Sequence, residues 1–144
     1  SSGVHFADGS VQNQAVTIKT IGTLPQKVVD VAKIYLNSDD MGKHVFVSNS
    51  STQIVIPDAT KVPMTVGATI TLINRSGGTI NVSKDNDYET GTIYGAGTTD
   101  NSTTWNIPDT GGGGIVTLIK IRDEYTGGSR YVDWMIAGTN IAVP

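Results

Sequence analysis

The side chains with the greatest capacity for chemistry gather in one polar stretch of the chain. Asp85, Asp87 and Glu89 alternate within residues 84–114, a segment rich in glycine, threonine, asparagine and aspartate. Oxygen ligands at alternate positions suit Ca²⁺, and paired carboxylates can cleave glycosidic bonds. The spacing departs from the EF-hand loop, however, because Thr90 stands where that loop needs a glycine. We therefore expect a solvated acidic turn here, with no metal and no other cofactor.

Nucleophilic catalysis finds little support among the residue types present. The chain has no cysteine, only two histidines, His5 and His44, and no serine in a G-x-S-x-G turn. Four glycines at 111–114 run into Ile115 and lack the Lys-Ser/Thr pair of a phosphate-binding loop. We expect no catalytic residue. A Ser/His/Asp site assembled from distant residues, or a small glycan hydrolase that uses the acids of the polar segment, remains an open alternative.

Aromatic rings in the same polar segment favour recognition over catalysis. Three of the nine aromatic residues of the chain fall within 84–114. Such rings offer a large contact area for little rotamer entropy, and they stack on the C–H faces of sugars. The predicted contacts with a glycan or receptor are the rings Tyr88, Tyr94 and Trp105, with Asp85, Asp87 and Asn101 as polar partners. The alternative is that these rings cover the core, above all Trp105, whose surroundings resemble the end of a strand.

The elements that must position these residues are β-strands. The chain contains 15 Val, 15 Ile and 19 Thr against 4 Leu, and β-branched residues fit a pleated sheet better than a helix. The net charge of −3 and the lack of a Lys/Arg cluster exclude the usual footprint of a nucleic-acid-binding protein. No apolar run approaches the length of a membrane span, so membrane insertion is not expected.

The order of apolar runs and turns predicts the fold class. Short strands separated by turns about every ten residues indicate an all-β, antiparallel β-sandwich or jelly-roll-like barrel over residues 26–144. Residues 28–36 fit a helical stripe or a strand, and the composition favours the strand. Three strand pairs are expected in the body: 44–47 with 53–56 across the polar turn 48–51, 68–74 with 79–83 across Ser76-Gly77-Gly78, and 115–121 with 131–137.

Residues 1–25 form a separate arm in this interpretation. Asp8-Gly9 is a strong signal for a two-residue hairpin turn, and a lone hairpin is only marginally stable. The arm cannot bury its apolar side chains by itself, whereas three copies around an axis could bury them together. The residues predicted to form this trimer interface are Val4, Phe6, Val11, Val16 and Ile18.

Two parts of the chain resemble proteins of tailed bacteriophages. The arm carries GVHFADGSVQ at 3–12, and the body carries DMGKHVFV at 40–47, IVIP at 54–57 and VDWMIAG at 132–138. In this order they resemble the C-terminal β domain of tail fibres and other virion appendages.

The resemblance implies a virion protein on a tail fibre or the capsid surface. It would be a homotrimeric, non-enzymatic fibre tip or spike that contacts other virion proteins and a host-surface glycan or outer-membrane receptor. The alternative is a capsid fibre, decoration or neck protein with a purely structural role. Because the chain begins Ser-Ser-Gly without methionine, we expect it to be part of a longer protein.

Overall fold

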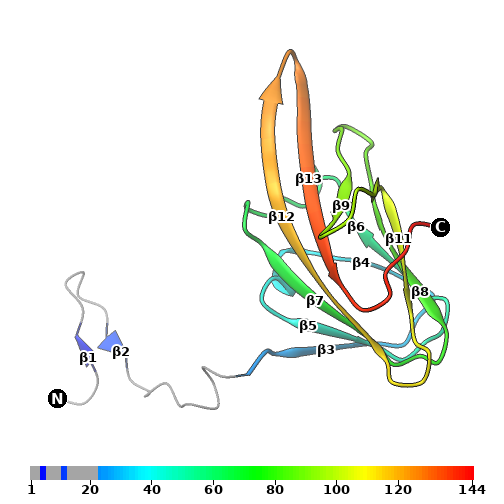
Figure 1. Ribbon diagram of the computed structural model, residues 1–144. Coiled ribbons are helices and arrows are strands. Elements are labelled where there is room, and N and C mark those ends of the chain that lie inside the picture. The colour runs from blue at the N-terminus through cyan, green and yellow to red at the C-terminus, as the bar shows by residue number, and fades with distance from the viewer. Residues whose placement is uncertain (1–3, 6–10, 13–22) are drawn as a thin grey trace.

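The structure, a computed structural model, describes residues 4–5, 11–12 and 23–144, with side chains from residue 23 onward. It is nearly all β, with 51% of the residues in strands and 2% in helix, which confirms the all-β prediction (Figure 1). No helix in the described part of the chain has the length and apolar character needed to cross a membrane.

Two mixed sheets make up the body. The seven-stranded sheet has the order β10 (Asn101–Ser102), β9 (Ile93–Gly95), β13 (Ser129–Gly138), β12 (Gly114–Thr126), β7 (Thr69–Asn74), β5 (His44–Val47) and β3 (Gln26–Val29). The four-stranded sheet has the order β11 (Thr104–Pro108), β8 (Thr79–Lys84), β6 (Gln53–Ile56) and β4 (Lys33–Tyr35). A 3₁₀ turn, η1 (Ser38–Asp40), lies between β4 and β5, capped by the Asn37 side chain.

From β3 to β8 the chain changes sheet after every strand. Each strand therefore pairs in parallel with the strand two places along: β3 with β5, β5 with β7, β4 with β6, and β6 with β8. The expectation of antiparallel pairing throughout is wrong for this reason. A strand of the opposite sheet supplies the return crossing that a helix supplies in βαβ units. The sandwich or jelly-roll-like topology within the all-β class stays a prediction.

Three local predictions change with this path. The turn at 48–51 does not join a strand pair, because β5 pairs with β3 and β7 while β6 pairs with β4 and β8. The turn at Ser76-Gly77-Gly78 does not close a hairpin, because β7 pairs with β5 and β12 while β8 pairs with β6 and β11. Residues 28–36 do form strand, as the composition favours, but the segment divides into the end of β3 and all of β4, which lie in different sheets.

One apolar core lies between the two sheets. Ile54 and Ile56 enter it from β6, and Ile70 and Leu72 enter it from β7. Trp105 of β11 is only 1% exposed, and its indole Nε1 donates a hydrogen bond to the Ile93 carbonyl oxygen at 2.9 Å. Gly95 makes room for this ring, because a Cβ there would stand 2.4 Å from the indole.

The predicted hairpin of β12 and β13 is confirmed, and it is longer than expected. Its turn is Gly127-Gly128, with φ of +61° and +81°, a conformation that glycine adopts without steric cost. The neighbouring β7 pairs with β12 only as far as Ile119, so the outer part of the hairpin projects beyond the sheet (Figure 1).

The arm is described only in part. β1 (Val4–His5) and β2 (Val11–Gln12) pair antiparallel, with Val4 opposite Gln12 and His5 opposite Val11. The predicted turn at Asp8-Gly9 and the predicted interface residues Phe6, Val16 and Ile18 lie outside the described residues. The homotrimer therefore stays a prediction.

Truncating the buried indole tests the core. Trp105→Ala should lower the free energy of unfolding by about 3–5 kcal/mol, because it removes a fully buried ring and leaves a cavity. Trp105→Phe should cost less, since most of the ring volume is kept and one hydrogen bond is lost. Urea unfolding curves measure both changes. If Trp105→Ala had the same free energy of unfolding as the wild type, the indole would not be part of the core.

Candidate functional site

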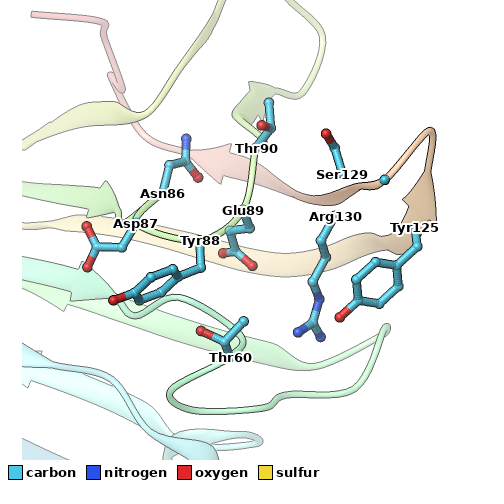
Figure 2. A pocket seen from close by; sticks show the side chains of 10 residues that line it. Thr60, Asn86, Asp87, Tyr88, Glu89, Thr90, Tyr125, Ser129 and Arg130 are labelled. Carbon is cyan, nitrogen blue, oxygen red and sulfur yellow. The ribbon is translucent and has the colours of Figure 1, made fainter.

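The polar segment and the β12–β13 hairpin meet at a pocket of about 410 Å³ (Figure 2). Residues 86–90, which follow β8, form one wall. Tyr125 and residues 128–130, at the tip of the hairpin, form the other, and Thr60 completes the lining. The volume lies within the range of about 300–1,000 Å³ that is common for small-ligand sites.

Two exposed tyrosines flank this pocket. Tyr88 and Tyr125 are each 72% exposed, and Figure 2 shows their rings on opposite sides, with Glu89 and Arg130 between them. Each ring also has a cation over it. Lys61 Nζ lies 5.9 Å from the Tyr88 ring centroid, and the Arg130 guanidinium lies 5.4 Å from that of Tyr125. Cation–π attraction of this kind favours a defined position for an exposed ring.

Buried contacts hold the Tyr88 wall. Lys84 Nζ donates to Glu89 at 2.9 Å with both side chains buried, and the second oxygen of Glu89 accepts from the Ala59 backbone N–H. The buried Asp58 carboxylate accepts from the backbone N–H of Tyr88 at 2.8 Å. Burial by itself would raise the pKa of Asp58, but hydrogen bonds from Thr60 and Tyr88 outweigh it and hold this pKa below its usual value.

A second charged cluster holds the Tyr125 wall. Arg130 donates Nε and Nη2 to the two oxygens of Asp123, both at 2.9 Å, and the buried Lys120 donates to the same carboxylate at 2.8 Å. The hydrogen bonds from Arg130, followed by the one from Lys120, lower the pKa of Asp123 to about 2.

A β-bulge decides which way this part of the hairpin faces. The pairing of β12 with β13 shifts between Lys120 and Arg122, so Ile121 is the extra residue. Such a residue reverses the alternation of the side chains beyond it. The side chains of Asp123 and Tyr125 therefore point to the same side as the inward-facing Lys120, while those of Arg122 and Glu124 point to the opposite face.

The charges that line the pocket are balanced within the chain. Asp87 pairs with Lys61, Glu89 with Lys84, and Arg130 with Asp123. A charged ligand would have to compete with these partners. An uncharged ligand that carries hydroxyl groups would instead meet the hydroxyls of Thr90 and Ser129. It would share Thr60 with Asp58, and it would share Asn86 with Lys84 and the Gly91 carbonyl oxygen.

The predicted site residues separate into three places. Tyr88 and Asp87 line the pocket, and Asp85 lies beside it, its backbone N–H bonded to the Ile56 carbonyl oxygen. Tyr94 and Asn101 are cross-strand neighbours at the β9–β10 edge of the seven-stranded sheet. Trp105 lies in the core. Its prediction as a receptor contact is wrong, because β11 pairs along its whole length with β8 and turns the ring inward.

Sequence reasoning missed the hairpin wall, namely Tyr125, Ser129 and Arg130. The signal was present, because Tyr125 stands two residues before Gly127-Gly128, a dipeptide typical of a tight hairpin turn. An aromatic residue beside such a turn is a candidate for an exposed contact. Only the fold, however, could show that this turn lies next to Tyr88.

The acidic residues do not form a metal centre in the described part of the chain. No group of three or more His, Asp or Glu side chains there could hold a metal ion. Asp87 and Glu89 each bond a lysine instead, so the Ca²⁺ alternative gains no support from the geometry.

Replacing Asp123 with asparagine tests the cluster under the hairpin wall. Because its pKa in the folded protein lies near 2, against about 3.8 unfolded, Asp123 should stabilise the fold by about 2 kcal/mol at pH 7. A carboxyl group whose pKa is lowered by folding stabilises the folded state at pH values above its unfolded pKa. This stabilisation is lost as the pH falls toward the folded pKa. The stability gap between wild type and Asp123→Asn should therefore narrow between about pH 4 and pH 2.

Denaturant unfolding at several pH values measures this gap. Glu124→Gln is the matched control, because Glu124 pairs with Arg122 on the solvent side of the same strand and should contribute only about 0–1 kcal/mol. A gap that does not change with pH would contradict the assigned role of Asp123.

Comparison with known proteins adds no relative to this description. No protein-family model matches the chain, and no curated protein matches it.

Proposed function

We propose that this chain is a non-enzymatic adhesion domain of a bacteriophage virion, a fibre tip or spike that attaches to the host surface through the pocket between Tyr88 and Tyr125. The observation that carries the proposal is the pair of exposed rings on either side of a polar, charge-balanced hollow. The resemblance of the arm and body segments to tail-fibre proteins supports the virion as the location.

The chemistry of the pocket favours a neutral glycan as the ligand. Tyrosine rings can stack on the C–H faces of a sugar, and nearby hydroxyl and amide groups can bond its hydroxyls. An acidic sugar would face Asp87 and Glu89, and it would compete with Asp123 for Arg130. A basic ligand would find both carboxylates of the lining already paired with lysine.

Assembly belongs to the same proposal. The arm brings three copies together, as its apolar residues predict, and joins them to other virion proteins. Three pockets on one particle would then engage the cell at once. Weak binding at each pocket would be multiplied by the high effective concentration of the second and third contacts.

Removing either tyrosine should abolish most of the binding to host cells. Tyr88→Ala and Tyr125→Ala should each weaken binding at least tenfold, which is typical for a central aromatic contact of an interface. Because both rings are exposed, the unfolding midpoint should change little. Tyr35→Ala is the matched control, since Tyr35 is 55% exposed with Lys33 over its ring, and it lies on β4 outside the pocket.

Binding of the labelled protein to host cells, with melting temperature measured in parallel, decides this prediction. If all three variants bind like wild type, the pocket is not the receptor site. The structural role as a capsid fibre, decoration or neck protein would then become the better explanation, and labelling of the capsid shell in electron micrographs would support it.

The class of glycan can be tested separately. On an array of neutral and acidic oligosaccharides, the wild type should bind neutral sugars, and this binding should change little between low and high salt because charge attraction contributes little. Binding confined to acidic sugars would overturn the neutral assignment and leave adhesion intact. Release of reducing ends from host polysaccharide, lost in Asp87→Asn with Glu89→Gln, would instead support the hydrolase alternative.

A further inference from the structure

The seven-stranded sheet has a surface turned away from the core that we call the outer face. Its side chains form three rows across the strands, because residues paired in register point to the same side. The first row is Val28, Phe46, Ile73 and Ile115. The middle row is Gln26, His44, Thr71, Thr117 and Ala137. The third row is Thr69, Ile119, Met135, Tyr94 and Asn101.

Two of these rows are mainly apolar, and folding alone does not explain them. The alternate positions of the same strands fill the core, so the outer face takes no part in it. Val28 is 63% exposed and Ile115 is 50% exposed. A sheet face that meets water usually carries polar residues, and contiguous exposed apolar surface marks an interaction site.

The outer face also lacks formal charge. None of its residues is Asp, Glu, Lys or Arg, although these types make up 16% of the chain, and its titratable groups are His44 and Tyr94. Charges lie at its borders: Arg75 stands two residues beyond Ile73 on the same side of β7, and Arg122 lies past the bulge, where it contacts Asp133 and Glu124. Depletion of charge is what distinguishes the centre of a protein interface from the remaining surface.

We infer that the outer face packs against other copies of this chain. The order of the rows, apolar then polar then apolar, matches itself when two such faces meet about a twofold axis that runs along or across the rows. Apolar rows then cover apolar rows, and hydroxyl and amide groups meet their own kind. Copies with a net charge of −3 repel one another, and an uncharged face adds least to that repulsion.

Other occupants fit less well. A strongly charged partner would find no opposite charges in the three rows, and a glycan would find the hydroxyl and amide groups spread along a sheet, not gathered around a pocket. The inference goes beyond the proposed function, because it holds whatever the pocket binds. It also differs from the trimer predicted for the arm, because it assigns the contact to residues of the folded body.

The experiment measures the mass of the full chain in solution by light scattering, for wild type and for two variants. The wild type should give a multiple of the 15.1 kDa chain mass at micromolar concentration. Ile115→Lys and Ile119→Lys place a charge in each apolar row at exposed positions, where the monomer should still fold. Each should raise the dissociation constant of the contact between bodies at least tenfold and lower the mass toward that of the trimer held by the arm, and circular dichroism should show an unchanged β spectrum.

Val66→Lys is the matched control, because Val66 is 57% exposed and precedes β7 outside the three rows. It should leave the mass unchanged. A monomeric wild type would overturn the inference. So would a mass that neither isoleucine variant lowers, which would assign all assembly to the arm, and so would equal dissociation by Val66→Lys, which would show that the outer face has no special part.

Discussion

The structure depends on a single apolar core that must be covered from both sides. Neither sheet could bury its apolar side alone, because β6 needs Ile70 and Leu72 of β7 opposite it, and β7 needs Ile54 and Ile56. The early strands are only three to six residues long, and the chain crosses to the other sheet after each one. Parallel pairing follows from this path, since each crossing returns the chain in the same direction.

The core also determines where the pocket walls stand. Lys84 and Lys120 are buried at its border, and a buried ammonium group needs a partner. Their carboxylate partners, Glu89 and Asp123, belong to the segments that carry Tyr88 and Tyr125. The two rings are therefore positioned by charges that would be costly to leave unpaired, even though the rings themselves lie in solvent.

One hairpin contributes to both surfaces for which we propose a role. Before the bulge at Ile121, β12 turns Ile115 and Ile119 to the outer face. After it, the alternation is reversed, and Tyr125 faces the pocket together with Arg130 of β13. Without the extra residue, Tyr125 would lie on the same side as the isoleucines. A local irregularity of one residue thus separates a polar recognition surface from an uncharged one.

The sequence by itself determined the β character, the alternation of buried and exposed positions, and the need for glycine at turns such as Gly42, whose φ is +75°. These are local properties, since β-branched side chains and positive φ angles act within a few residues. The exposure of Tyr88 followed from its polar surroundings in the same way. Strand partners, the burial of Trp105 and the meeting of Tyr88 with Tyr125 were decided only by the tertiary structure. The alternation of apolar and polar residues along a strand shows which side of the strand is buried, but it carries no information about which distant strand will lie beside it.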